Sequence, residues 1–299
     1  MMQDKKTLAA ATDTIEEWWD TNPFTLGLSD KSNDLVGRVD ISQMDLHYFD
    51  EIERKFRKHN RGGLGEDTGL LFSKFIDYTW LKGKAALDIA VGSGFSMVTL
   101  IKGGAHVTGI DLTNFAVMET KRNLELRHMQ GEVLKMDAQH MTFADDTFDF
   151  VNAWGCLMHM PDTEGAIAEI HRVLKPGGRA FAYMYNKSSW PFWFNLILLR
   201  GVLMGKLITY RFDIDRLTSR YSDGFSVGGN MLAKFYTPRQ VERMFKDAGF
   251  SNVHAFPLEL PEEPNHWPVG VFPIFKYLPV FIKKRMSKWS YGLLVQAEK

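Results

Sequence analysis

The sequence predicts an α/β protein with a doubly wound, mostly parallel seven-stranded sheet. Between residues 84 and 186, short apolar segments alternate with helical patterns, as expected where helices cover both faces of a parallel sheet. The first apolar segment runs into a glycine-containing turn and a helix in the stretch ALDIAVGSGFSM, residues 86–97. Two late apolar segments, with no ordinary helix between them, predict an antiparallel pair that closes the sheet.

Five strands and three helices account for the central part of this pattern. The strands are expected at residues 84–90, 106–110, 132–136, 148–154 and 179–185, and the helices at 95–102, 114–129 and 163–174. Lys175-Pro-Gly-Gly178 predicts that the third helix stops and that the chain turns tightly into the fifth strand.

The same signals divide the chain into four parts. Residues 1–80 are expected to form a mainly helical segment, with its clearest helix at 49–59, which leads into a core at 81–186. Residues 187–236 are an aromatic-rich insertion without strand alternation, expected to form a helical cap. Residues 237–299 complete the sheet with strands at 251–256 and 291–297, after a helix that begins at the capping box Thr237-Pro-Arg-Gln240 and ends at Gly249.

Composition excludes several classes of protein. Lys and Arg together number 36, as do Asp and Glu, so no net charge attracts the 299-residue chain to nucleic acid. The single cysteine, Cys156, cannot form an internal disulfide, and no cluster of His and acidic residues has the spacing of metal ligands. The N-terminus has no apolar core of the length that a signal peptide needs, which predicts a cytoplasmic protein.

One apolar run tests that prediction. SSWPFWFNLILL, residues 188–199, continues as GVLMGKLITY beyond Arg200. A membrane span needs about 20 apolar residues, and Arg200 near its middle would cost about 2.5 to 3.5 kcal/mol on insertion. The run therefore predicts a buried or interfacial helix.

The glycine turn at residues 92–94 lacks the features of a phosphate-binding loop. A dinucleotide fingerprint requires a third glycine where Met97 stands, and no Gly-Lys-Ser/Thr follows as in a P-loop. The turn also follows an acid, Asp88, whose charge would repel a pyrophosphate and attract an ammonium group.

Two further acids end the next two strands. Asp111 is placed to accept hydrogen bonds from ribose hydroxyls, and Asp137 from an adenine amino group. Ligands of open α/β sheets bind at the carboxyl ends of the strands. The three acids therefore predict a nucleoside cofactor that carries an amine and no phosphate.

A family resemblance rests on these residues. Together with GAHVTGIDLT and MDAQHMTFADDTFDFVNAWGCLMHMPDTEGAIAEIHRVLKPGG, they are similar to the class I S-adenosylmethionine-dependent methyltransferases, in the group that includes enzymes of ubiquinone and menaquinone biosynthesis. The resemblance covers about residues 84–186, and FYTPRQVERMFKDAGF adds weaker support. Ala90 departs from the family pattern, which usually has glycine there, and alanine is tolerated if its φ is negative.

The resemblance implies a Rossmann-like methyltransferase fold, S-adenosylmethionine as the cofactor, and a role for each matching position. Asp88 and the backbone of Ala90, Gly92 and Gly94 would line the methionine moiety. The other cofactor positions would be Asp111 at the ribose, Leu112 beside the adenine, Asp137 and Ala138 at the adenine edge, and Ala153 and Trp154 near the methylthio group.

Two residues are candidates for catalysis. His159 follows the fourth strand, close to where a methyl group would be delivered, and a neutral imidazole there could take a proton from the nucleophile. A histidine that only shapes its loop is the plainer interpretation. Tyr185, after the fifth strand, could touch the substrate.

Aromatic residues outside the core are candidates for covering the site. Trp18 and Trp19, with Tyr48 and Phe49, would form a lid over the cofactor, although core packing explains them equally well. In the cap, Trp193 and Phe225 are expected to cover the acceptor.

The sequence thus predicts an enzyme that moves a methyl group from S-adenosylmethionine to a small, lipophilic or aromatic acceptor, without a metal and without nucleic acid. The alternatives are an NAD(P)-dependent oxidoreductase and a non-catalytic cofactor-binding protein. The tail at 267–289, with aromatic residues beside Lys283, Lys284 and Arg285, could rest on a membrane surface. A solvated helix before the last strand is the plainer and slightly preferred interpretation of that tail.

Overall fold

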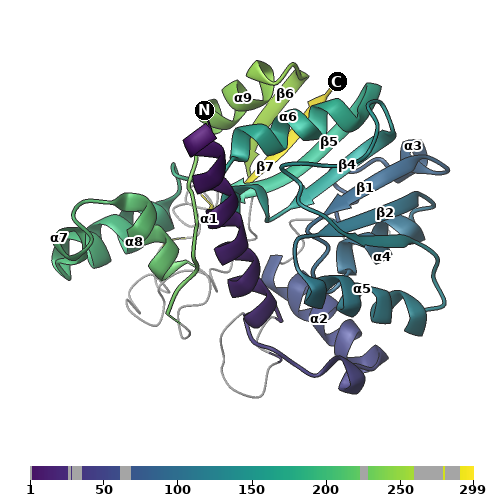
Figure 1. Cartoon of the computed structure of the whole chain (residues 1–299), viewed down its shortest axis with the longest axis horizontal. Helices are drawn as coiled ribbons and strands as arrows, with labels where there is room; N and C mark the ends of the chain where they lie inside the picture. The colour runs from purple at the N-terminus through teal and green to yellow at the C-terminus, as the bar shows by residue number, and fades with distance from the viewer. Residues whose placement is uncertain are drawn as a thin grey trace.

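A seven-stranded sheet forms the centre of the molecule (Figure 1). The computed structural model describes residues 2–25, 28, 36–60, 69–222, 228–258, 279 and 290–299; Phe225 and nearly all of the tail at 267–289 lie outside these ranges. The strands are β1 (Ala85–Ile89), β2 (His106–Asp111), β3 (Glu132–Lys135), β4 (Phe148–Trp154), β5 (Leu174–Tyr185), β6 (Ser251–Pro257) and β7 (Gly292–Glu298). Their order is β3-β2-β1-β4-β5-β7-β6.

Strand direction follows the predicted pattern. β1 to β5 pair in parallel, and β7 runs antiparallel to both of its neighbours, β5 and β6. The mostly parallel sheet and its antiparallel closing pair are therefore confirmed.

Helices cover both faces of the sheet, because its strands alternate their apolar side chains between two cores. Leu87 and Ile89 of β1 pack in one core with α6 (Thr163–Val173) and α9 (Pro238–Asp247). Ala86 packs in the other core with α2 (Leu46–Asn60), α4 (Phe95–Lys102) and α5 (Asn114–Leu126). This is the doubly wound arrangement predicted from the sequence.

Some element boundaries differ from the prediction. The helix expected at 114–129 ends at Leu126, because the chain leaves the helical conformation and His128 takes a φ of 53°. The expected turn at 175–178 belongs to β5, since Gly177 donates its N–H to the carbonyl of Lys299 and extends the edge contact. The capping box of Thr237 and Gln240 is present at the start of α9.

The N-terminal part and the insertion are built from helices. The first contains α1 (Met2–Thr21), the short 3-10 helix η1 (Ile41–Gln43), α2 and α3 (Tyr78–Leu81). The insertion contains the π-helix η3 (Pro191–Leu203), α7 (Lys206–Thr209) and α8 (Ile214–Tyr221), and Figure 1 shows α7 and α8 at one end of the molecule, away from the sheet. Among the helices of the described residues, none is long and apolar enough to cross a membrane.

Candidate active site

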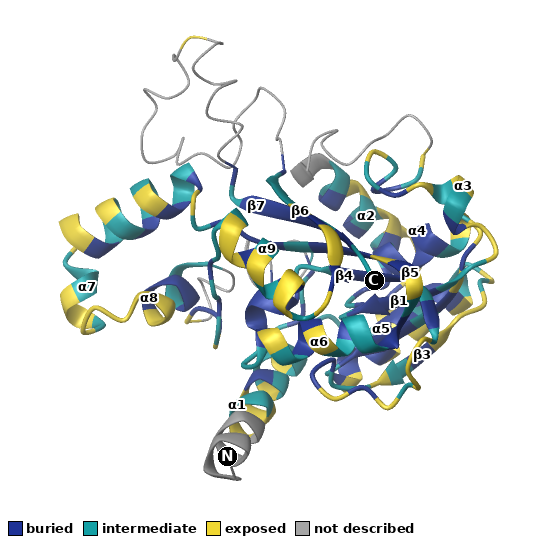
Figure 2. Ribbon diagram, turned by 90° about the horizontal axis from the view of Figure 1, so that it is seen from above, coloured by how far each residue is buried: buried dark blue, intermediate teal, exposed yellow. Residues whose placement is uncertain are grey.

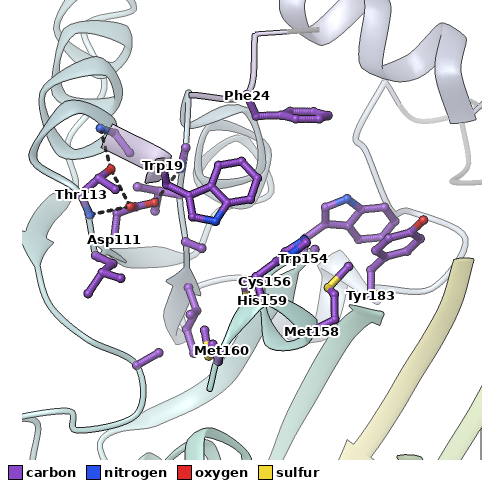
Figure 3. Close-up of a pocket in the computed structure, with 18 of the residues that line it drawn as sticks. Trp19, Phe24, Asp111, Thr113, Trp154, Cys156, Met158, His159, Met160 and Tyr183 are labelled. Atoms are coloured by element: carbon purple, nitrogen blue, oxygen red, sulfur yellow. Dashed lines mark hydrogen bonds between the residues drawn. The ribbon is translucent and has the colours of Figure 1, made fainter. Parts of the chain in front are cut away.

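A cavity of about 480 Å³ lies at the carboxyl ends of the central strands. Its walls include the residues that follow β1, β2 and β3, the loop after β4 with the 3-10 helix η2 (Leu157–His159), and the end of β5. α1 and the insertion add further walls, and Figure 3 shows Trp19 of α1 at the cavity. Of the residues proposed from the sequence, the lining includes Ala90, Gly92, Asp111, Leu112, Asp137, Ala138, Trp154, His159 and Tyr185, and it does not include Asp88, Gly94 or Ala153.

The glycine turn exposes backbone to the cavity at one glycine and packs against a helix at the other. Gly92 has a φ of 53°, and a Cβ placed on it would meet nothing within 4 Å, so a ligand can pass close to its backbone. Gly94 has a φ of 80°, and a Cβ there would lie 2.9 Å from a side-chain atom of Thr120. Gly94 therefore permits helix packing and does not form the cavity wall.

Ala90 has the conformation that the sequence argument excluded. Its φ is 57°, in the left-handed region, and not negative as expected. The backbone of the turn between β1 and α4 imposes this value, and the Cβ of alanine then clashes with the following carbonyl at a cost of about 1 to 2 kcal/mol.

Asp111 is held in place by the turn that follows β2. Its Oδ1 accepts from the N–H and the hydroxyl of Thr113, at 2.9 Å each, and its Oδ2 accepts from the N–H of Gly92 at 3.2 Å (Figure 3). These bonds fix the carboxylate where it lines the cavity. Burial raises the pKa of Asp111.

Asp88 lies behind the cavity wall rather than in it. Its oxygens accept from Ser96 Oγ and Asn152 Nδ2, both at 2.6 Å, and only 1% of its surface is exposed. The reason is the strand register: Asp88 and Asn152 are partners on β1 and β4. Burial raises the pKa of Asp88 to about 6. Ala153, on β4, is likewise buried in the core.

Asp137 organises the loop after β3. Its Oδ1 accepts from the backbone N–H of Gln139 at 2.9 Å and from the Gln139 amide at 3.0 Å. Gln139, which the sequence argument missed, also lines the cavity; it donates to Thr12 of α1 and accepts from the N–H of Asp162 before α6. The side chain therefore ties α1 to the sheet.

Glu119 is a second acid of the cavity that the sequence argument missed. It lies on α5, lines the cavity, is 1% exposed and accepts from the Tyr48 hydroxyl at 3.1 Å. Burial raises its pKa to about 8. The signal was its helical spacing from Ala116 and Asn123, which places the acid on the buried face of α5.

The cavity lining is acidic, although Glu119, whose pKa is about 8, keeps its proton at neutral pH. Among the described residues, the lining contains Asp111, Glu119 and Asp137 but no lysine or arginine. Asp88, immediately behind the wall, adds a fourth acid. A cation in the cavity would offset the desolvation of these groups, whereas a phosphate would meet no opposite charge.

The loop after β4 brings His159 to the cavity and determines its tautomer. The ring is 7% exposed, and Nδ1 lies 2.6 Å from the carbonyl oxygen of Leu232. The side-chain amide nitrogen of Asn230 lies 3.2 Å from the same Nδ1. The contact with the carbonyl oxygen is the shorter one, and that oxygen can only accept, so it places the proton on Nδ1 and the lone pair of the neutral ring on Nε2. Cys156, on the same loop, has its pKa raised by burial and is therefore a poor nucleophile.

Aromatic rings wall the part of the cavity next to His159. The Trp154 and Tyr183 rings stack at 4.6 Å, and the His159 ring meets Tyr185 at 5.5 Å and Trp19 at 5.4 Å, edge to face in both cases. Figure 3 shows Trp19 between Asp111 and the Trp154–Tyr183 pair in this view.

The expected lid and cap residues are only partly at the cavity. Of the four lid aromatics, Trp19 lines the cavity and Phe49 packs in a separate core cluster. The expectation for Trp193 is wrong, because this residue is 54% exposed and outside the lining. The insertion instead contributes Pro191, Asn195, Tyr221 and Ser222. Within the described ranges, no group of three or more His, Cys, Asp and Glu could hold a metal ion.

The strand order and the position of the cavity define an open α/β protein with a ligand site at the carboxyl ends of its strands. Comparison with known proteins narrows this class. Residues 87–182 match a family described as a methyltransferase domain. SAM-dependent methyltransferase structures from Methanosarcina mazei and Thermotoga maritima share the fold, at TM-scores of 0.51 and 0.50. They are 21% and 17% identical and cover 76% and 85% of this chain, and 95% and 97% of their own.

Three curated relatives are similar in sequence. Phosphoethanolamine N-methyltransferase 2 of Caenorhabditis elegans is 34% identical over 42% of this chain and 29% of its own length. Ubiquinone biosynthesis O-methyltransferase of Coxiella burnetii is 25% identical over 65% of this chain and 71% of its own, and sterol 24-C-methyltransferase of Gibberella zeae is 29% identical over 70% and 51%. The chain thus spans less than a third of the nematode enzyme and about half of the fungal one.

Over residues 87–182 the chain is thus similar to a methyltransferase domain, and these matches support the class I S-adenosylmethionine-dependent methyltransferase that the resemblance implied. Its cofactor is S-adenosylmethionine, as the resemblance implied, and the oxidoreductase alternative is set aside.

Proposed function

We propose that the protein transfers the methyl group of S-adenosylmethionine to a small, uncharged acceptor that is lipophilic or aromatic. The observation that carries this proposal is the composition of the described cavity lining, which has three acids, one of them Glu119 with its raised pKa, and no lysine or arginine. The cofactor is a cation with a sulfonium and an ammonium group and no phosphate, so acids suit it. A nicotinamide dinucleotide would place its pyrophosphate against them.

Residues at three strand ends would each bind a different part of the cofactor. Asp111, which is fixed at the cavity wall by Gly92 and Thr113, would accept from a ribose hydroxyl. Asp137, with Leu112 and Ala138 beside it, would hold the adenine. Gly92 would let the backbone approach the methionine end, and Asp88 would act there through its charge, since its oxygens already have partners.

His159 would serve as the general base. The cofactor supplies an electrophilic methyl group, and transfer then needs an aligned, desolvated nucleophile. The hydrogen bond from Nδ1 to the Leu232 carbonyl leaves the lone pair of neutral His159 on Nε2. Nε2 is therefore the nitrogen that would take the proton from the nucleophile. Tyr185 supports the ring edge to face, and the Trp154–Tyr183 pair would exclude water.

The acceptor class follows from the walls of the cavity near His159. Trp154, Tyr183 and Tyr185 offer aromatic faces, which favour an apolar or aromatic molecule. The names of the ubiquinone and sterol relatives agree with a lipophilic acceptor, but the three relatives are named as O-, C- and N-methyltransferases, so they leave the acceptor atom open. A phosphorylated acceptor, as in the nematode relative's name, would find no described basic residue in the cavity.

Calorimetry tests the cofactor assignment. The chain should bind S-adenosylmethionine, and Asp111→Ala should weaken that binding by about 1.5 to 3 kcal/mol, the scale of a charge-assisted hydrogen bond. Asp50→Ala removes an exposed acid outside the cavity and should leave binding unchanged. Binding of NADH without binding of S-adenosylmethionine would overturn the proposal.

A further inference from the structure

Exposed apolar side chains are concentrated in the insertion. Of the eleven large hydrophobic residues that are prominently exposed in the described part of the chain, nine lie between residues 193 and 231. The most exposed are Leu203, Ile208 and Phe212, at 70%, 74% and 71%. Figure 2 shows this exposure along α7 and the helix that leads to it. Together η3, α7 and the turn before α8 form one surface, here called the apolar cap face.

The helix η3 is apolar on all sides yet only partly covered. Its sequence, PFWFNLILLRGVL, has Arg200 as its single charge. Phe192 and Leu196 are buried, whereas Trp193 and Val202 are 54% and 57% exposed. A helix that is hydrophobic all round normally lies inside a protein or a membrane. The outer side of η3 is exposed among the residues that the structure describes, which its composition does not lead one to expect.

The turn between α7 and α8 holds an aromatic ring outward at an energetic cost. Arg211 and Phe212 have φ values of 54° and 62°, so two consecutive residues with side chains adopt the left-handed conformation. Each costs about 1 to 2 kcal/mol. The turn leaves Phe212 among the most exposed aromatic side chains, so its conformation does not serve the core.

The charge of this region differs from that of the whole chain. Residues 187–222 contain six basic residues, Lys187, Arg200, Lys206, Arg211, Arg216 and Arg220, and two acidic ones, Asp213 and Asp215, whereas the full chain has equal numbers of both. Arg211 and Arg216 are exposed and Lys206 is partly exposed, whereas Arg200 is held inward by Asn195 and the Tyr221 ring. An apolar face accompanied by lysine and arginine complements an anionic phospholipid surface, where the apolar side chains enter the headgroup boundary and the basic ones meet the phosphates.

We infer that the apolar cap face docks on the surface of an anionic phospholipid bilayer. The helices that carry this face also line the cavity, through Pro191 and Asn195 of η3 and Tyr221 of α8. Docking would therefore set the acceptor side of the cavity next to the bilayer. That consequence rests on the proposed function, but the docking itself does not.

Vesicle sedimentation with the full chain tests the inference. The protein should sediment with vesicles of equal parts phosphatidylglycerol and phosphatidylcholine, and much less with phosphatidylcholine alone. Ile208→Gln with Phe212→Asn should weaken binding by at least about ten-fold, since both changes remove apolar contact area; asparagine also tolerates the left-handed turn. Lys206→Gln should weaken it about five-fold, and added salt should weaken the wild type.

Leu46→Ser and Met118→Ser are the matched controls, because they remove exposed apolar side chains from α2 and α5. Both should bind vesicles like the wild type. Circular dichroism and thermal unfolding check that every variant is folded. The inference would be overturned if the wild-type protein did not bind anionic vesicles, or if a cap variant bound them as well as the controls do.

Sedimentation velocity supplies the opposing outcome. A wild-type dimer that the cap variant dissociates, without vesicle binding, would assign the face to a second copy of this chain and overturn the membrane inference. Vesicle binding in a protein that fails to bind S-adenosylmethionine would remove the proposed function and leave the docking standing.

Discussion

Ala90 carries backbone strain at the entrance to the cofactor site. Its φ of 57° lies where glycine is free and alanine is not. The residue lines the cavity, so its conformation is part of the surface that faces the ligand. Strain of this kind persists because β1 and α4 on either side determine the path of the turn.

Ala90→Gly should relieve this strain. The left-handed penalty of about 1 to 2 kcal/mol disappears, and glycine's greater unfolded-state entropy costs about 0.5 to 1 kcal/mol, so urea unfolding should show a gain of up to about 1 kcal/mol. Ala86→Gly, on the same strand but without a positive φ, should instead lose stability. Equal losses in both variants would show that Ala90 is unstrained.

His159→Asn separates a base from a residue that shapes its loop. Asparagine can still donate to the Leu232 carbonyl but has no counterpart of Nε2. We expect turnover to fall on the order of 10²-fold with S-adenosylmethionine affinity intact, and the acid limb of the wild-type pH–rate profile to vanish. Near-normal turnover in this variant would leave the histidine a structural role only.

At the scale of elements, two side chains of α5 hold the glycine turn by hydrogen bonds to its backbone. Thr120 Oγ1 donates to the carbonyl of Gly92, and Asn123 Nδ2 donates to that of Ser93, both at 2.7 Å. Glu119, one turn before Asn123, connects α5 to α2 by accepting a hydrogen bond from the Tyr48 hydroxyl. The polar face of α5 therefore positions the turn, and the cost of this arrangement is one buried acid.

Glu119 should make the stability of the cofactor-free protein depend on pH. Burial raises its pKa to about 8 in the folded protein, from the ordinary value of 4.5. The folded state thus holds the proton more tightly, so this stabilisation is complete below pH 4.5 and is lost as pH rises toward 8. Glu119→Gln does not ionise, and its stability relative to the wild type should rise by about 1 kcal/mol or more between pH 5 and 8.

Denaturant unfolding at several pH values measures this difference. Glu125→Gln, an exposed acid on the same helix, is the control and should track the wild type at each pH. A constant offset between Glu119→Gln and the wild type would mean that Glu119 is ionised in both states.

At the scale of the whole molecule, the sheet, α1 and the insertion together enclose a site of one charge sign. The strand ends supply the acids, and η3, α8 and β5 supply apolar and aromatic walls. Neither half alone would select a substrate. Together they form one cavity, with acids at the strand ends and apolar and aromatic side chains next to them.

The methyl label of the cofactor should therefore end up in a product that is more soluble in an organic solvent than in water. When the protein is incubated with cell extract and S-adenosylmethionine carrying a radioactive methyl group, the label should partition into the organic phase on extraction. Asp111→Ala should reduce that label. A water-soluble, phosphorylated product would contradict the proposed acceptor class.

The sequence by itself determined the parts that depend on local pattern. Apolar periodicity and turn residues predicted each strand of the core, and the capping box predicted the start of α9, because these signals report the face and the ends of one element. The acids Asp111 and Asp137 were predicted at the cavity because parallel strands end at the same edge of a sheet.

Only the tertiary structure decided which side chains meet the cavity. Asp88 is not part of the lining, because its carboxylate accepts a hydrogen bond from the side-chain amide of Asn152 on the neighbouring strand. Glu119 lines the cavity because α5 packs against the glycine turn. Trp193 faced outward because Phe192 and Leu196 took the buried side of η3. Sequence periodicity tells which residues share a face, but contacts between elements far apart in the chain decide what that face touches.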